Sequence, residues 1–308
     1  MAPRLLSSIF SALLLPTLAL AAAPHPLAEK VAPGASLTLQ FPALAPDRHG
    51  RPASCEVRIP AGYDPSRKLP LVAWLAGGEG GTAPASGFLP PGDFVLVGLP
   101  YPKGSANPAQ PNMVGDFAKV WAYHRAMIDD VHRLLPNIDR RSSILAGFSN
   151  GGHAIDGMLR TRNGPAPTDG VPTNSILIQG ARLPKPPYSD PDSADGARPA
   201  KVTLIQGSLG FTVSDYFGIL IAADGGGTSY TSIGQLQALK GRYAYVCWGE
   251  KSPNRRSGEA FARALKGKGA TVEASEMKGV GHAFPETEQA KIRDWLAKVA
   301  LPGCAAGK

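Results

Sequence analysis

The chain has 308 residues, and 43% of them are hydrophobic, which is the composition of a folded protein and excludes a disordered chain. Its formal charge of +8 is spread along the sequence without a dense Lys/Arg block. We therefore interpret the charge as favouring solubility, and we expect no nucleic-acid partner.

The first residues have the pattern of a secretory signal. Arg4 precedes a long apolar run, and the small residues at 19–23 offer cleavage sites. The run is interrupted by Pro16 and is short for a membrane span. We therefore expect residues 1–23 to be a signal peptide and residues 24–308 to be one domain, secreted or periplasmic after cleavage and without a stable membrane span.

Apolar segments of two kinds follow, and together they predict an α/β fold. Strands are expected from alternating patterns or continuous apolar runs at residues 36–41, 55–60, 69–76, 94–99, 143–146, 218–223, 243–248 and 272–276. Helical spacing is found at residues 117–135, in the segment after residue 149, around residues 260–265 and at residues 286–299. Pro136 ends the first of these helices. Strands that alternate with helices predict a mostly parallel, twisted sheet with helices on both faces.

One stretch, residues 163–214, breaks this alternation. It is rich in Pro, Gly, Ser and Asp, and it holds two similar apolar pieces at 175–180 and 202–207. We expect an insertion before the sixth core strand, with the two pieces forming a strand pair over the functional edge of the sheet. The alternative is that one piece is itself a strand of the main sheet.

The chain has three cysteines, Cys55, Cys247 and Cys304. Cys247 lies in an apolar strand, so we expect a buried free thiol there. The spacing leaves open whether Cys304 pairs with Cys55 or with Cys247. No Cys/His cluster has metal-ligand spacing and His-Glu-x-x-His is absent, so we expect no metal and no cofactor.

The most informative motif is Gly147-Phe148-Ser149-Asn150-Gly151, which lies between an apolar strand and a helical segment. A Gly-x-Ser-x-Gly in that context predicts a nucleophile elbow, a tight turn that exposes the serine at the end of a strand. A serine hydroxyl becomes a good nucleophile only when a neighbouring base takes its proton. The motif therefore predicts a histidine and an acid elsewhere in the chain.

Of the six histidines, His282 has the position expected of that base. It follows the last predicted strand and precedes the last helix, on the edge where ligands bind in sheets of this kind. The alternative is an ordinary histidine in a surface loop. The chain order serine, acid, histidine places the acid between the two, and both Asp224 and Glu250 follow predicted strands. Either could instead be a solvated loop carboxylate.

Donors for the negative charge that develops on an attacked carbonyl are expected at two places. One is the backbone N–H of Asn150, directly after the nucleophile. The other is Gly78 or Glu79, in the glycine loop after the strand at 69–76. A phosphate-binding role for this loop is the alternative, but the Gly-Lys-Ser/Thr of such loops does not follow.

From Val57 to the last helix, the chain resembles α/β-hydrolases, most closely secreted esterases of the poly(3-hydroxybutyrate) depolymerase and feruloyl or acetylxylan esterase group. The resemblance is carried by four segments: Ile59-Pro60-Ala61-Gly62-Tyr63, Pro70-Leu71-Val72-Ala73-Trp74-Leu75 with the glycines after it, Gly147-Phe148-Ser149-Asn150-Gly151-Gly152 and Gly281-His282-Ala283-Phe284. It implies that Ser149 is the nucleophile and His282 the base, with an oxyanion hole at Gly78 or Glu79 and at Asn150.

The chain departs from the pattern of these esterases at two positions. Ala76 stands where they usually have a histidine before the double glycine, and Ser252 stands where they have the triad aspartate. Some lipases of this fold carry the acid one strand earlier. Asp224 stands at about that place, so we favour it over Glu250.

The residues and the resemblance together predict a secreted serine hydrolase that cleaves carboxylic esters through an acyl-enzyme. Its substrate would be a small-molecule ester or a polymer, as for a polysaccharide esterase or a depolymerase. A non-catalytic relative that binds a polymer or a protein is the first alternative, because the aspartate at position 252 is missing. A peptidase of the same fold is the second, since ester and amide cleavage use the same machinery.

Overall fold

An eight-stranded sheet organises the molecule. The computed structural model describes residues 25–161, 212–227 and 236–306. The sheet has the strand order β1-β2-β4-β3-β7-β8-β9-β10. Its strands are β1 (Ser36–Gln40), β2 (Ser54–Arg58), β3 (Leu71–Leu75), β4 (Val95–Gly98), β7 (Ile144–Phe148), β8 (Ile219–Ala223), β9 (Tyr243–Gly249) and β10 (Thr271–Met277).

The sheet is mostly parallel. β4, β3, β7, β8, β9 and β10 pair with one another in parallel, while β2 is antiparallel to both β1 and β4. The carboxyl ends of β7, β8 and β9 therefore lie at one edge of the sheet. The predicted α/β fold class with a mostly parallel sheet is confirmed.

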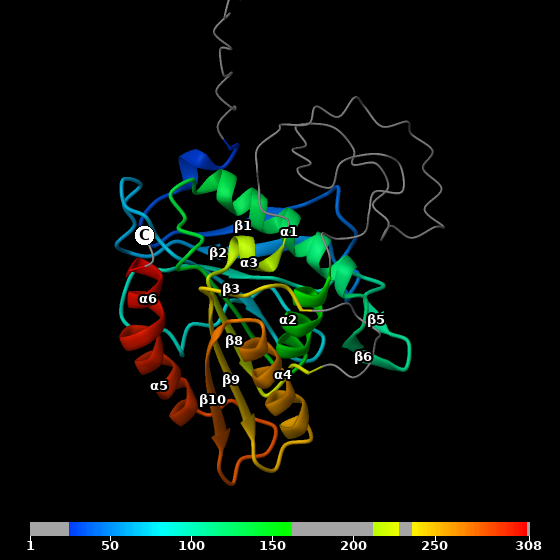
Figure 1. The fold of residues 1–308 in the computed structure, drawn as a ribbon. Coiled ribbons are helices and arrows are strands. Elements are labelled where there is room, and N and C mark those ends of the chain that lie inside the picture. The colour runs from blue at the N-terminus through cyan, green and yellow to red at the C-terminus, as the bar shows by residue number, and fades with distance from the viewer. Residues whose placement is uncertain (1–24, 162–211, 228–235, 307–308) are drawn as a thin grey trace, which may run out of the picture.

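Helices cover both faces of this sheet, with α2 and α4 on one side of β8–β10 and α5 and α6 on the other (Figure 1). The helices are α1 (Phe117–Leu134), α2 (Asn150–Arg160), α3 (Val213–Tyr216), α4 (Arg255–Gly267), α5 (Glu286–Trp295) and α6 (Leu301–Ala306). A π-helical turn at Leu296–Ala300 joins α5 to α6, and a short 3-10 helix lies at Ala28–Lys30.

Strand β3 explains why the central strands are apolar throughout. Leu71, Ala73 and Leu75 pack into a core with the helices α1, α2 and α4. Val72 and Trp74 point to the opposite face and pack into a second core that includes residues of α5 and α6. Successive side chains of a strand alternate between faces, so a strand covered on both sides has no polar position.

The structure adds elements that the sequence patterns did not predict. A two-stranded hairpin, β5 (Ala106–Asn107) and β6 (Gln110–Val114), precedes α1, and the short helix α3 precedes β8. The single helix predicted at 286–299 is instead α5 followed by the π-helical turn.

Two predicted segments lie wholly or mostly outside the described residues. They are the signal peptide at 1–23 and the insertion at 163–214 with both of its apolar pieces. The last residues of the insertion are described, and they belong to α3, which begins in a capping box formed by Thr212 and Asp215. β8, which follows, is the sixth strand of the main sheet along the chain.

The three cysteines are free and buried. Cys247 is the buried free thiol that was expected, and neither possible pairing of Cys304 is formed. Burial raises the pKa of the Cys304 thiol to about 11, so this thiol is protonated at neutral pH and unreactive. Of the helices that the structure describes, none has the length and apolar character that crossing a membrane requires.

A buried histidine on α1 makes the stability of the fold depend on pH. His124 is completely buried, its Nε2 lies 2.8 Å from the carbonyl oxygen of Pro100, and its Nδ1 has no hydrogen-bond partner. A carbonyl only accepts, so Nε2 carries the proton and Nδ1 is bare. Protonating Nδ1 would bury a charge, and burial lowers the pKa of His124 from 6.5 to about 4.

The unfolded chain therefore binds a proton at residue 124 between pH 6.5 and about pH 4, and the folded chain does not. Stability is lost as the pH falls through this window. Between pH 7 and pH 5, we expect the wild type to lose about 2 kcal/mol more free energy of unfolding than His124→Gln. Urea unfolding at both pH values measures this difference. Burial also lowers the pKa of His132 and His153. Both histidines are present in the wild type and in His124→Gln, so their contributions cancel in the difference between the two proteins. An equal loss of unfolding free energy in the wild type and in His124→Gln would contradict the prediction.

Candidate active site

The Gly-x-Ser-x-Gly motif forms the turn that it predicts, between β7 and α2. A Cβ atom at Gly151 would lie 2.1 Å from the carbonyl oxygen of Leu75, and one at Gly147 would lie 2.6 Å from the carbonyl carbon of Gly151. Glycine is therefore required on both sides of the serine. Ser149 has φ 55° and ψ −115°, and its N–H donates to the carbonyl of Ala223 at the end of β8 (2.8 Å).

His282 lies against this serine. It is in the loop between β10 and α5, and its Nε2 is 2.8 Å from Ser149 Oγ. Its Nδ1 is hydrogen-bonded to Asp224 Oδ2. A carboxylate only accepts, so Nδ1 carries the proton and Nε2 is free to accept one from the serine. The His282 side chain is 40% exposed, and its ring is stacked on Phe148 with the centroids 5.1 Å apart.

Asp224 is the acid that the structure brings to His282. It follows β8, is completely buried, and its N–H donates to the carbonyl of Cys247 (2.8 Å). Oδ1 accepts from the N–H of Gly249 (3.1 Å), and Oδ2 accepts from the hydroxyl of Ser252 (2.8 Å) as well as from the imidazole. A buried carboxylate requires several donors, and this one has three.

Ser252, the residue that departs from the esterase pattern, is one of those donors. Its Oγ accepts from the N–H of Asn254 (3.1 Å), so its proton is left to donate to Asp224. The side chain of Asn254 in turn donates to the backbone carbonyl of Asp224 (2.8 Å). Sequence reasoning missed both supporting roles, because a hydroxyl and an amide in a loop carry no signal of their own.

Glu250, the other candidate acid, lies elsewhere. Its carboxylate accepts from the N–H of Gly279 (2.7 Å) and lies 3.6 Å from Lys278 Nζ. These contacts lower the pKa of Glu250, with the hydrogen bond from Gly279 the larger cause. Glu250 thus contacts the backbone of the loop that carries His282, and the acid that contacts the imidazole is Asp224.

The backbone at two of these positions is unusual. Ser149 (φ 55°) and Asp224 (φ 46°) are the two non-glycine residues with positive φ in the part of the chain that the structure describes. Such a conformation costs a non-glycine residue about 1–3 kcal/mol and persists only where the surroundings enforce it. Backbone strain of this kind clusters at functional sites. Here it occurs at two of the three residues whose side chains are hydrogen-bonded to one another, Ser149 and Asp224 but not His282.

The glycine loop after β3 lies next to the elbow. A Cβ atom at Gly77 would be 3.2 Å from Ser149 Cβ, and the hydroxyl of Tyr101 donates to the carbonyl of Ala76 (2.9 Å). The side chain of Asn150 donates to the carbonyl of Gly78 (2.7 Å). The glycine loop thus begins next to the serine and is tied to Asn150, and the role of Gly78, Glu79 and Asn150 as an oxyanion hole stays a prediction.

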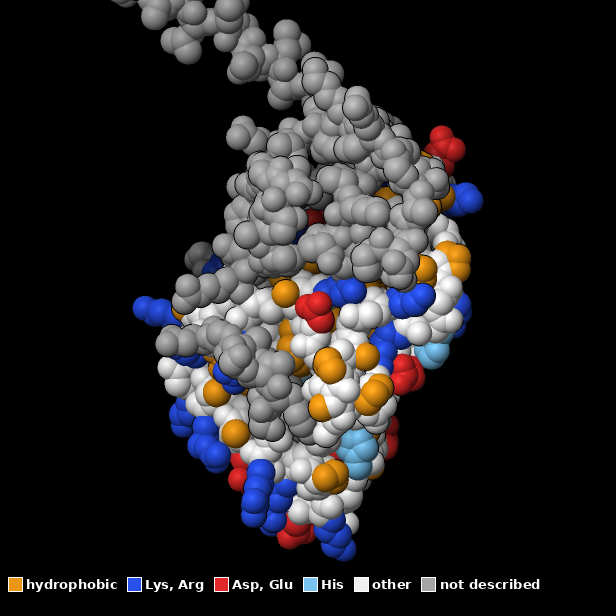
Figure 2. All heavy atoms as spheres, turned by 90° about the vertical axis from the view of Figure 1, so that its right-hand side faces the viewer, with side chains coloured by type: hydrophobic (Ala, Val, Ile, Leu, Met, Phe, Trp, Pro, Cys, Tyr) orange, Lys and Arg blue, Asp and Glu red, His pale blue; other side chains and the backbone are white. Residues whose placement is uncertain are grey.

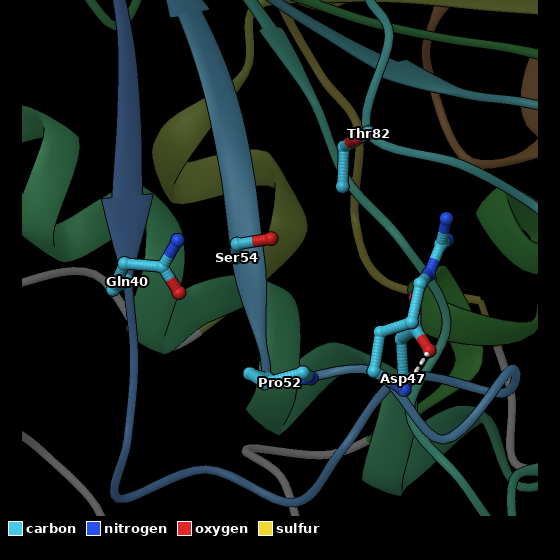
Figure 3. Close-up of a pocket in the computed structure, with 6 residues that line it drawn as sticks. Gln40, Asp47, Pro52, Ser54 and Thr82 are labelled. Atoms are coloured by element: carbon cyan, nitrogen blue, oxygen red, sulfur yellow. Dashed lines mark hydrogen bonds and ion pairs between the residues drawn. The ribbon is translucent and has the colours of Figure 1, made fainter.

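A pocket with other lining residues is drawn in Figure 3, where five of its six lining residues are labelled. Arg51 is the sixth, and it shares an ion pair with Asp47 (2.7 Å). The oxygens of Asp47 also accept from the N–H groups of His49 and Arg51 (both 2.9 Å). The carboxylate oxygens of Asp47 are therefore engaged within the turn.

The described residues contain no group of three His, Cys, Asp or Glu side chains placed to hold a metal ion. On the face drawn in Figure 2, Lys and Arg occupy several separate places with Asp and Glu among them. Several Lys and Arg side chains of the described residues form ion pairs, as Arg255 does with Glu276 (2.9 Å).

Comparisons with known proteins found likeness in structure only. No protein-family profile and no curated protein sequence matches the chain. A ferulic acid esterase from Anaeromyces mucronatus superposes with a TM-score of 0.49 and 14% identity over 90% of this chain and 94% of its own. The carboxylesterase of Bacillus cereus gives 0.48 and 12% over 85% and 93%. Esterase 2 of Thermogutta terrifontis gives 0.48 and 13% over 89% and 96%.

Proposed function

We propose that this protein is an exported serine hydrolase that cleaves carboxylic esters through an acyl-enzyme. One observation carries the proposal: Ser149 Oγ, the His282 ring and Asp224 form a continuous chain of hydrogen bonds. A nucleophile bonded to a base, with the base oriented by a third group, is recognised by this geometry and not by sequence position.

The chemistry follows from the partners of each group. Ser149 Oγ attacks the ester carbonyl while His282 Nε2 takes its proton. The imidazole then gives this proton to the leaving alcohol, and the acyl group stays on the serine oxygen. Water, deprotonated by the same nitrogen, attacks the acyl-enzyme and releases the carboxylic acid. Asp224 fixes the tautomer and stabilises the imidazolium that forms in each step.

The oxyanion of each tetrahedral intermediate requires donors in fixed positions. We assign them to the backbone N–H of Asn150 and to one N–H of the glycine loop, at Gly78 or Glu79. The closeness of this loop to Ser149 supports the assignment. The proposed mechanism uses only groups of the chain itself and a water molecule.

A non-catalytic binding protein was the alternative suggested by Ser252. The position of Asp224 weighs against it, because a buried carboxylate already contacts the imidazole and Ser252 donates to that carboxylate. The signal-like pattern at residues 1–23 supports export, with the substrate met outside the cytoplasm. A peptidase would use the same residues, so hydrolysis of nitrophenyl esters is to be compared with that of matched nitroanilides.

Labelling with a fluorophosphonate tests the proposal directly. We expect one covalent adduct on the purified protein, located on Ser149 by peptide mapping, because an activated serine attacks phosphorus as it attacks a carbonyl. His282→Ala should prevent labelling, since it removes the base, while His49→Ala, a histidine in an exposed turn, should not. A wild-type protein that forms no adduct and hydrolyses no ester would refute the proposed function.

A further inference from the structure

The side chain of Asn150 has an unusual set of partners for the residue that follows a nucleophile. It is completely buried. Its Nδ2 donates to the carbonyl of Gly78 (2.7 Å) and lies 3.4 Å from the carbonyl of Asn112, while its Oδ1 accepts from the N–H of Val114 (3.0 Å). One amide thus joins the elbow to the glycine loop and to strand β6 of the hairpin.

Arg48 joins the same two segments from a second direction. Its Nε lies 3.1 Å from a carboxylate oxygen of Glu79, and only 6% of the Arg48 side chain is exposed. Its guanidinium also donates to the carbonyls of Pro111 and Asn112. The glycine loop contributes few side chains of its own, so these contacts with the hairpin hold its backbone in place.

We propose that the Asn150 side chain is a positioning residue for the oxyanion hole, and that the second donor of the hole is the N–H of Glu79. The inference rests on the proposed function. In a planar trans peptide, the C=O and the N–H point in opposite directions. The carbonyl of Gly78 points to the buried amide of Asn150, so the N–H of Glu79 points away from that amide and is left free to bind an oxyanion.

Asn150 would then control both donors, one through its own backbone N–H and one through its side chain. This gives the β5–β6 hairpin a function, because β6 supplies two of the backbone groups that hold the amide of Asn150. Donors that are fixed before the reaction need no reorganisation when the charge develops. A loop free to rotate the peptide between Gly78 and Glu79 would lose that advantage.

Asn150→Asp tests the proposal with little change of shape. The carboxylate keeps an acceptor for the N–H of Val114 but has no hydrogen to donate to Gly78, and its charge repels that carbonyl. We expect kcat for a short-chain nitrophenyl ester to fall about 100-fold, the effect of losing one oxyanion donor, with KM changed less than about threefold. Inhibition by an aryl boronic acid, which forms a tetrahedral adduct on the serine, should weaken in parallel.

Gln40→Glu is the matched control, because it makes the same change from amide to carboxylate at an exposed position. Gln40 is the last residue of β1 and has no place in the glycine loop, the elbow or the hairpin. We expect its kcat to stay within about twofold of the wild type. Arg48→Gln, which removes the ion pair with Glu79, should lower kcat in the same direction as Asn150→Asp, but less.

Three results would overturn the inference. Asn150→Asp could keep kcat and boronate affinity, Arg48→Gln could leave kcat unchanged, or the kcat of Asn150→Asp could fall only together with its melting temperature. In each of these cases the role inferred for Asn150 is wrong, but the proposed function still holds as long as the wild type hydrolyses esters. A wild type without esterase activity or a fluorophosphonate adduct would defeat both.

Discussion

Ser149→Ala abolishes measurable turnover of a short-chain nitrophenyl ester, with an expected loss in kcat of about 10⁶-fold, the size found when a triad serine is removed. The hydroxyl is the group that forms the bond to the acyl carbon, and among the described residues it is the side-chain group hydrogen-bonded to His282 Nε2. The oxyanion donors remain, so a small residual rate above that of water is expected.

The variant should fold like the wild type. Alanine keeps the Cβ atom, so the strain of φ 55° at this position is unchanged, and the hydrogen bond from the N–H of residue 149 to Ala223 uses only backbone. The loss can then be assigned to the hydroxyl. Ser66→Ala, at an exposed turn, serves as the control and should keep full activity. Hydrolysis by Ser149→Ala at the wild-type rate would show that another residue is the nucleophile.

Asp224→Asn is expected to lower kcat by about 10⁴-fold, with the protein still folded. An aspartate at this place only accepts, and it holds the proton of His282 on Nδ1. An amide of the same shape can turn its NH₂ group toward Nδ1, which moves the imidazole proton to Nε2. The histidine then faces the serine with a donor and cannot take its proton.

Glu250→Gln is the matched control, because it makes the same chemical change at the other candidate acid. Glutamine keeps an oxygen that accepts from the N–H of Gly279, so the loop that carries His282 stays in place. We expect kcat/KM within about twofold of the wild type, because most substitutions at the surface that break no buried contact have small effects. The reverse ranking, with Glu250→Gln inactive and Asp224→Asn active, would remove Asp224 from the proposed triad.

The fold and two of the three side chains were predictable because each has a local signal. Continuous apolar runs marked the buried strands, and the glycines around Ser149 marked the elbow. His282 was found from its place after the last strand. These signals act over a few residues, and the parallel sheet then brings the strand ends to one edge.

The choice of acid was different, since Asp224 and Glu250 both follow apolar strands. What separates them is strand order: β8 pairs with β7, which carries the serine, whereas β9 lies one strand further away. Burial separates them as well, because the donors to Asp224 come from Gly249 and Ser252, far along the chain. Neither the order nor these contacts can be read from the residues around position 224.

The hairpin escaped prediction for a related reason. Its second strand, Gln110–Val114, has little apolar character, so no period-two pattern marks it. The hairpin is instead held by Asn150 and Arg48. The predicted insertion at 163–214 and the signal peptide at 1–23 remain predictions, because they lie almost wholly outside the described residues.

The left-handed backbone at Ser149 and Asp224 has an evolutionary consequence. Glycine tolerates that conformation without strain. At position 224 it would leave three donors without an acceptor, but at position 149 a laboratory screen for heat resistance alone would favour glycine and yield stable, inactive variants. The trade-off between stability and activity is thus concentrated at the serine, and its persistence in a lineage would itself record selection for turnover.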